Sequence, residues 1–324
     1  METRNIFITG GLGFIGSNIA INLIRRNQDV TLATLSKRNM WRIRQNTDSF
    51  EIIELDVTNQ NRVKDTLKLI RPDIIVHNSV FGAYHEKNQD KIFQVNLYGL
   101  INMINAYLET QADLFINTST ISEYGIKNSP FEETDLLNPL GDYAVSKAAA
   151  TMFCESTRNL TKRNVITTRI ANPYGPFEKP QDLIPYLILH RIKGQEVQLN
   201  SPYNVRDFIY IDDIVDAYWQ IISSYEIITS SIFNIATGIE TTIGKLVELV
   251  ETIVPGNGPI QVKWNANEPR VKDVANHYSA SIKRIYNELK WRPKFNMRDG
   301  IKKFYSWIQD IGLKDEEIKY IYDI

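Results

Sequence analysis

The chain has 324 residues, of which 43% are hydrophobic and 23% are charged, a usual composition for a soluble globular protein. Its 37 basic and 38 acidic residues give a formal net charge of −1, which argues against a general nucleic-acid-binding protein. No apolar run approaches the ~20 residues of a membrane-spanning helix, and no apolar signal core precedes the first strand. Cys154 is the only cysteine, so neither an internal disulfide nor a cysteine-based zinc site can form. We therefore expect a soluble, cytoplasmic protein that holds no metal and binds neither nucleic acid nor membrane.

The N-terminal half alternates short apolar segments with amphipathic ones. The apolar segments predict strands at 6–8, 29–35, 50–55, 73–79, 113–118 and 164–171. The amphipathic segments predict helices at 15–24, 61–70, 90–109 and 143–160. Strands that alternate with helices indicate βαβ units. The fold class that we expect is therefore α/β, with a Rossmann-like, doubly wound parallel sheet that helices cover on both faces.

The character of the sequence changes after Asn172, where four prolines fall between 173 and 185. Helices are then predicted at 183–193, 212–223, 242–253, 281–289 and 300–308, and strands at 205–211 and 231–236. We predict that residues 1–172 form a dinucleotide-binding domain and that 205–238 return to it. The remainder of 173–324 would form a smaller, mixed C-terminal substrate-binding region that interleaves with this domain.

A glycine-rich segment, residues 9–16, joins the first predicted strand to the first predicted helix. Glycines at this point permit a tight turn and a close approach of the backbone to a pyrophosphate. The N-terminus of the helix offers unpaired N–H groups and the positive end of its dipole. We therefore predict that a dinucleotide binds to Gly10, Gly13, Phe14, Ile15 and Gly16.

The end of the second strand bears on the choice of cofactor. NAD-binding folds usually place an acidic residue there, which binds the ribose 2′-hydroxyl. Here the residues are Ser36, Lys37 and Arg38, a hydroxyl and two cations that suit the 2′-phosphate of NADP. We favour NADP(H) on this ground and keep NAD(H) as the alternative, with Lys37 and Arg38 in a solvated loop. Three further candidate contacts of the cofactor follow the next strands: Asp56, Val57 and Asn78.

Tyr143 and Lys147 stand four residues apart on a predicted helix, so their side chains share one face. A free tyrosine has a pKa of about 10. A neighbouring lysine cation is expected to lower this pKa because it stabilises the phenolate. Such a pair can exchange a proton with a hydroxyl or carbonyl group during hydride transfer. We expect both residues to be catalytic and to contact the cofactor, Lys147 through the nicotinamide ribose.

At this point the chain resembles the extended short-chain dehydrogenase/reductase family, in particular its nucleotide-sugar epimerases, dehydratases and reductases. The resemblance covers nearly the whole chain. It rests on motifs in a fixed order: residues 9–16, 55–58, 95–96, 118–120, 124–125, 143 with 147, 169–176 and 206–213. This set is specific for the family and less informative about the reaction.

The resemblance implies roles for the matching residues. Thr120 matches the serine or threonine that hydrogen-bonds the reacting sugar oxygen. Asn172 matches an amide that contacts the nucleotide diphosphate, and Arg206 and Arg270 match arginines that clamp it. Residues 183–199 would border the nucleotide base. The family also implies a nucleotide-sugar substrate and a homodimer built from the helices at 90–109 and 143–160.

Two departures from the family pattern restrict the reaction. Dehydratases of the family carry an Asp-Glu pair directly after the catalytic serine or threonine, and this pair eliminates water. Here those positions are Ile121 and Ser122, and Glu123 is one position out of register, so we expect no 4,6-dehydration. Epimerases of the family usually hold NAD tightly and carry an acid after the second strand, which is absent here.

The leading hypothesis is therefore an NADPH-dependent reduction of a nucleotide-linked 4-keto-6-deoxy sugar at C4, with Tyr143 as the proton donor. The alternative enzyme is a nucleotide-sugar 4-epimerase with tightly bound NAD. A rival from another class is a non-catalytic dinucleotide-binding protein that senses redox state, although such relatives typically lose the tyrosine or the lysine.

Overall fold

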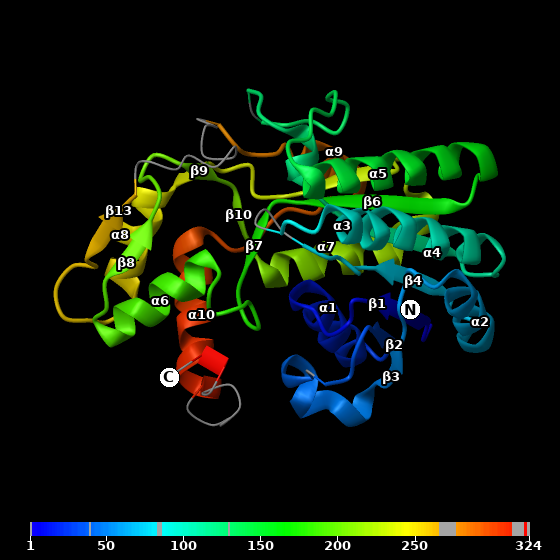
Figure 1. Ribbon diagram of the computed structural model, residues 1–324, viewed down its shortest axis with the longest axis horizontal. Helices are drawn as coiled ribbons and strands as arrows, with labels where there is room; N and C mark the ends of the chain where they lie inside the picture. Colours follow the sequence, from blue (N-terminus) through cyan, green and yellow to red (C-terminus); the bar gives the residue numbers. More distant parts are fainter. Residues whose placement is uncertain are drawn as a thin grey trace.

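The structure is a computed structural model that describes residues 2–38, 40–82, 86–128, 130–265, 277–312 and 321–322. Within these residues, seven parallel strands form one sheet in the order β11-β6-β5-β4-β1-β2-β3 (Figure 1). The strands are β1 (Asn5–Thr9), β2 (Asp29–Thr34), β3 (Glu51–Glu54), β4 (Ile74–His77), β5 (Leu114–Thr120), β6 (Asn164–Ile170) and β11 (Ile232–Ile235). The order reverses between β1 and β4, which confirms the predicted Rossmann-like, doubly wound parallel sheet.

Helices pack on both faces of this sheet. α1 (Phe14–Arg25) and α7 (Ile211–Ser224) cover one face, and α2 (Gln60–Ile70), α4 (Gly99–Leu108) and α5 (Asp142–Thr161) cover the other. In β1, Ile6 and Ile8 belong to the core that includes α1 and α7, whereas Phe7 belongs to the core on the α2 and α4 side. Because both faces are buried, the central strands are continuous apolar runs rather than alternating ones.

The predicted helix at 90–109 is interrupted by a π-helical turn. α3 (Gln89–Phe93) leads into this turn (Gln94–Tyr98), and α4 follows. Asn96, in the turn, is buried, and its amide bonds both the backbone N–H and the carbonyl of Phe81 and donates to Ser146 Oγ (3.1 Å). Such turns are frequent at functional sites. This one ties the segment after β4 to α5, the helix that carries Tyr143 and Lys147.

The remaining elements form three small sheets and several helices, and Figure 1 shows α6, α8, β8 and β13 together at the left of the main sheet. The sheets pair β7 (Asn172–Tyr174) with β10 (Phe208–Tyr210), β9 (Val205–Arg206) with β12 (Thr241–Thr242), and β8 (Val197–Leu199) with β13 (Val262–Trp264). The helices are α6 (Leu183–Lys193), α8 (Ile243–Ile253), α9 (Lys283–Leu289) and α10 (Met297–Gly312). Short 3₁₀ segments lie at Trp41–Ser49, Ile121–Tyr124 and Tyr225–Ile227. The prediction missed β8 and β13 because three residues are too few to show a period.

The prediction of one strand at 205–211 is wrong. The segment forms β9 and β10, which lie in different sheets on either side of Asp207. The fully buried Asp207 carboxylate accepts hydrogen bonds from the backbone N–H groups of Thr237, Gly238 and Ala280 and from Thr237 Oγ1. β11 does return to the main sheet, where it pairs with β6. The division into domains at residue 172 stays a prediction.

Candidate functional site

A groove of about 320 Å³ opens where β1 and β4 end, at the point where the strand order reverses. Ligands of open α/β sheets bind at such switch points. Six of the predicted cofactor contacts line this groove: Gly10, Gly13, Ser36, Asp56, Val57 and Asn78. The structure therefore brings together residues that the sequence spreads over four strand ends.

The glycines of the first turn allow two segments of the protein backbone to pack closely together. Gly10 has φ +63°, and a Cβ there would lie 2.6 Å from the carbonyl oxygen of Asn78. A Cβ on Gly16 would collide with the carbonyl oxygen of Gly10. Gly13 is the N-cap of α1, and within the described residues no side chain caps this end of the helix. The first N–H groups of α1 can therefore hold the pyrophosphate of a dinucleotide.

The opposite end of the groove differs from the prediction. Ser36 lines it, but neither Lys37 nor Arg38 is among the lining residues. The strand ends at Thr34, and the chain then turns outward, with the backbone N–H of Lys37 held by Glu54 Oε1 (3.0 Å). The role predicted for the two cations is therefore not supported by their position.

Arg42 is the arginine that lines the groove, and the sequence reasoning missed it. Its Nε donates to the carbonyl of Phe177 (2.8 Å), one of its terminal nitrogens donates to Leu12 (3.3 Å), and its guanidinium lies over the Trp41 ring. These contacts fix the side chain in the wall of the groove. Arg42 lies in the 3₁₀ segment Trp41–Ser49, whose sequence shows no amphipathic period that could have drawn attention to it.

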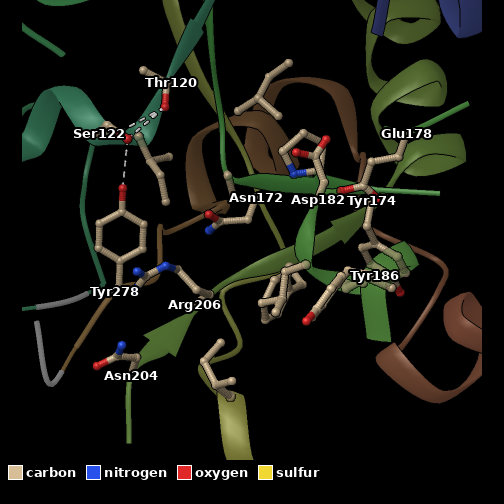
Figure 2. Close-up of a pocket in the computed structure, with 18 of the residues that line it drawn as sticks. Thr120, Ser122, Asn172, Tyr174, Glu178, Asp182, Tyr186, Asn204, Arg206 and Tyr278 are labelled. Carbon is tan, nitrogen blue, oxygen red and sulfur yellow. Dashed lines mark hydrogen bonds between the residues drawn. The ribbon is translucent and has the colours of Figure 1, made fainter. Parts of the chain in front are cut away.

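A second cavity, of about 770 Å³, lies between the main sheet and the C-terminal region. Figure 2 shows side chains from both parts of the chain directed into it. Predicted site residues that line it are Phe14, Ile15, Thr120, Tyr143, Asn172 and Arg206. Phe14 and Ile15 thus border this cavity rather than the groove. Arg270, the second predicted arginine, lies outside the described residues.

Tyr143 and Lys147 lie one turn apart on α5, as predicted. The Lys147 ammonium is buried and donates to the carbonyl of Thr118 at the end of β5 (2.6 Å). Burial lowers the pKa of Lys147 to about 8. Burial also raises the pKa of Tyr143 to about 12, and Tyr278 and Glu123 add to this rise. The prediction that the lysine lowers the pKa of the tyrosine is therefore wrong, because the loss of water around the phenol outweighs any effect of the cation.

A chain of hydroxyl groups crosses one wall of the cavity. Thr120 Oγ1 donates to Ser122 Oγ (3.1 Å), and Ser122 Oγ bonds the phenol oxygen of Tyr278 (3.0 Å) (Figure 2). Ile121, between the two, is 1% exposed. No carboxylate therefore follows Thr120 in the wall of the cavity, as the sequence indicated. Tyr278 was not predicted, because it comes from the far end of the chain.

Glu123, the only acid near these positions in the sequence, is fully buried below the cavity. Its carboxylate pairs with Arg169 Nε (2.7 Å) and accepts hydrogen bonds from the hydroxyls of Ser119 and Thr151. These partners satisfy both carboxylate oxygens. The side chain therefore stabilises the junction of β5, β6 and α5, and it is not among the residues that line the cavity.

The side chains expected to hold a diphosphate lie on β7 and β9. Asn172 donates through its amide to the carbonyl of Asp207 (3.0 Å), which locks β7 beside the turn after β9. The Arg206 guanidinium bonds the carbonyl of Val205 (2.7 Å) and lies 5.5 Å from the centre of the Tyr278 ring. A cation held in this way can face the phosphate oxygens of a bound nucleotide.

The model of the NAD dependent epimerase/dehydratase family matches residues 6–236. The chain belongs to this family. The match contains the glycine turn, the Tyr143–Lys147 pair and Arg206, and it ends at the close of β11. Within the described residues, no helix has the length and apolarity to cross a membrane, and no group of acidic, histidine or cysteine side chains is placed to hold a metal ion.

Several members of the family are similar to this chain over nearly its full length. A dTDP-D-glucose 4,6-dehydratase from Mus musculus is 28% identical over 94% of this chain and 88% of its own length. A dTDP-glucose 4,6-dehydratase from Haemophilus influenzae is 25% identical over 94% and 97%. The crystal structure of a UDP-glucose 4-epimerase from Thermotoga maritima is 23% identical, covers 94% of this chain and 98% of its own, and superimposes with a TM-score of 0.84.

Proposed function

We propose that this member of the family transfers a hydride at C4 of a nucleotide-linked sugar without eliminating water. The leading candidate reaction is the NADPH-dependent reduction of a 4-keto-6-deoxy sugar. The proposal depends on the two residues that follow Thr120 in the wall of the larger cavity. Ile121 is apolar, and Ser122 is hydrogen-bonded to Tyr278. Neither side chain is a carboxylate that could act as acid and base in a dehydration. The family resemblance implies an Asp-Glu pair at these two positions in a dehydratase, and this chain has neither residue there.

The buried phenol of Tyr143 suits a proton donor. With a pKa of about 12, it stays protonated at neutral pH and can give its proton to an alkoxide that forms at C4. Thr120 would orient the sugar oxygen, and the Lys147 cation would stabilise the negative charge that develops beside it. Asn172, Arg206 and Arg270 would hold the diphosphate. When bound, the nicotinamide cofactor supplies the hydride.

The preference for NADP(H) is part of the same proposal. No acidic residue lies between Thr34 and Arg38, where NAD-binding folds usually place one. Ser36 and Arg42 both line the groove, and a hydroxyl and a guanidinium are suitable partners of a 2′-phosphate. Titration of the protein with NADPH and with NADH tests the preference, and tighter binding of NADH would contradict it.

A direct assay tests the reaction. The purified protein is mixed with NADPH and a nucleotide-linked 4-keto-6-deoxy sugar, and the absorbance of the reduced cofactor is followed. We expect the absorbance to fall with at least one of the dTDP, CDP, GDP and UDP forms. If the absorbance falls with none of the four nucleotide forms, the reductase hypothesis is ruled out.

The second candidate is a nucleotide-sugar 4-epimerase. The position of Lys37 and Arg38 outside the groove favours it, because NAD needs no such cations. An epimerase would be purified with NAD bound and would interconvert C4 epimers with no added cofactor. The two candidates are therefore separated by one measurement of cofactor content and one of product stereochemistry.

The pH dependence of the rate should follow Lys147. Its charge is present below a pKa of about 8 and is lost as the pH rises through that value, whereas Tyr143 keeps its proton to about 12. We expect kcat/KM for reduction to fall as the pH rises above about 8. In the Lys147→Arg variant the guanidinium stays charged, so the fall should move to higher pH. If kcat/KM of this variant falls over the same alkaline pH range as in the wild type, the pH dependence is not due to Lys147.

Homodimerisation through α4 and α5 stays a prediction. Met152 and Leu160 on α5 and Tyr98 just before α4 are exposed apolar side chains that a partner subunit could cover. Leu100 and Ile104 on α4, in contrast, are fully buried in the core of the subunit. Sedimentation in solution measures the oligomeric state directly.

A further inference from the structure

Few charged groups line the larger cavity. Within the part of the chain that the structure describes, they are Arg206, Glu178 and Asp182. Figure 2 shows Arg206 on the same side of Asn172 as Thr120, and it shows the two acidic side chains on the other side. The cavity therefore has a cation near its acid–base end and an acidic part at the opposite end.

Glu178 is a buried carboxyl group with one oxygen that lacks a partner. The side chain is 6% exposed, and its Oε2 accepts a hydrogen bond from the backbone N–H of Gly175 (3.3 Å). Among the described residues, no group donates to Oε1 and no cation pairs with the carboxyl group. Buried carboxyl groups are usually hydrogen-bonded or paired. Because Glu178 lines the cavity, a bound ligand can supply the missing partner.

Asp182 follows Glu178 along the chain and directly precedes α6. It has the extended conformation of an N-cap residue, yet its side chain makes no capping bond to the helix. The side chain is exposed to the cavity instead, and the bond from its backbone N–H to the carbonyl of Lys179 (3.0 Å) fixes its position. Burial raises the pKa of Glu178, and the Asp182 charge adds to this rise, so the two carboxyl groups lie near each other.

The acidic end of the cavity suits one part of a nucleotide sugar. Such a molecule runs from the reacting sugar through the diphosphate to the ribose and the base. If Thr120 faces the sugar and Arg206 faces the diphosphate, the acidic end faces the nucleoside. Carboxyl groups do not attract phosphate oxygens, but they accept hydrogen bonds from hydroxyl groups. The ribose directly follows the diphosphate, and dinucleotide-binding folds use a carboxylate to bind ribose hydroxyls.

We propose that Asp182, with Glu178 beside it, binds the 2′- and 3′-hydroxyls of the substrate ribose and thereby determines the class of nucleotide. The site then favours a UDP, CDP or GDP sugar over a dTDP sugar, whose 2′-carbon carries no hydroxyl. This inference rests on the proposed nucleotide-sugar function and narrows its substrate class. Two of the similar proteins are named for dTDP-glucose, so similarity alone would suggest the opposite choice.

The test compares nucleoside diphosphates that differ only at the 2′-carbon. UDP and dUDP, CDP and dCDP, and GDP and dGDP are titrated into the purified protein by calorimetry. The pair whose ribonucleotide binds most tightly is retained. We expect this ribonucleotide to bind about tenfold more tightly than its 2′-deoxy counterpart, as for one hydrogen bond to a charged group. Equal or tighter binding of the 2′-deoxy form would overturn the proposal.

The Asp182→Ala variant should lose this preference, because its affinity for the ribonucleotide falls while its affinity for the 2′-deoxy form does not. The variant should fold, since the side chain is exposed and does not cap α6. Asp182→Asn keeps an acceptor oxygen and should retain part of the preference. An unchanged preference in Asp182→Ala would overturn the assignment. Equal weakening of both diphosphates would indicate a merely structural role and would overturn it as well.

The matched control is Asp65→Ala, the same change at an exposed aspartate of α2 that lines neither the groove nor the cavity. It should leave both affinities unchanged. The titrations need no turnover, so the absence of NADPH consumption would leave the comparison intact. Equal affinity for both members of the pair would overturn this inference alone. If the wild type binds none of the six diphosphates, the nucleotide-sugar function is overturned with it.

Discussion

Replacement of Tyr143 by phenylalanine is expected to lower kcat by about 10²–10⁴-fold, the usual contribution of a positioned general acid. The variant keeps the aromatic ring in the wall of the cavity and removes only the hydroxyl that would protonate the sugar oxygen. The binding of cofactor and nucleotide sugar should therefore change little. Steady-state kinetics give kcat, and a separate titration of each ligand shows whether binding is retained.

The same experiment decides between an enzyme and a sensor. A non-catalytic dinucleotide-binding protein would respond to the cofactor equally well with phenylalanine at 143. Tyr286→Phe is the control, because it removes an equivalent hydroxyl far from the cavity. Full turnover by the Tyr143→Phe variant would show that another group donates the proton.

Replacement of Arg169 by methionine is expected to lower the free energy of unfolding by about 3–5 kcal/mol, because it leaves one buried charge without its partner. Arg169 is 2% exposed, and it donates to Glu123 Oε2 (2.7 Å) and to the Tyr124 hydroxyl (2.8 Å). Urea unfolding followed by circular dichroism measures the change in midpoint and slope.

A second variant separates two quantities: the contribution of the Arg169–Glu123 ion pair to stability, and the destabilisation caused by leaving one of its charges unpaired. Replacing Glu123 by leucine together with Arg169→Met removes both charges, and it should recover part of the lost stability. Lys245→Met is the control, because its ion pair with Glu248 is exposed and should be worth about 0–1 kcal/mol. A change below 1 kcal/mol in Arg169→Met would contradict the assignment of this pair as a structural element.

The main sheet could be predicted from the sequence because its strands are buried on both faces. Segments such as 73–79 and 113–118 are continuous apolar runs, and helices with a clear amphipathic period separate them. The small sheets were harder to predict. Their strands contain two or three residues, and Asp207 breaks one predicted strand through bonds to residues that lie far along the chain.

The candidate site was predictable where its residues share a local pattern. The glycine turn and the Tyr143–Lys147 pair each lie within one element, so spacing alone indicates their geometry. Tyr278 and Arg42 have no such pattern, since each reaches the site only through tertiary contacts. The bond from Ser122 to Tyr278 joins residues 156 positions apart.

The pKa of Tyr143 shows a second limit of local reasoning. The sequence shows that a lysine lies one turn away, and this suggests a lowered pKa. The sequence does not show how much water the folded chain removes from the phenol, and this burial raises the pKa to about 12. The direction of the shift therefore depends on packing around α5 that only the tertiary structure defines.

The pairing of β11 with β6 has a consequence for biosynthesis. A ribosome delivers β6 long before β11, and every element from β7 to the 3₁₀ segment Tyr225–Ile227 must emerge in the interval. Until then β6 presents an unpaired edge, which is a template for intermolecular strand pairing. A gene fragment that stops at residue 172 would make this edge permanent, and its product should aggregate. Chimeras that exchange substrate preference between relatives should therefore graft loops around the cavity and retain the chain as one continuous unit through β11.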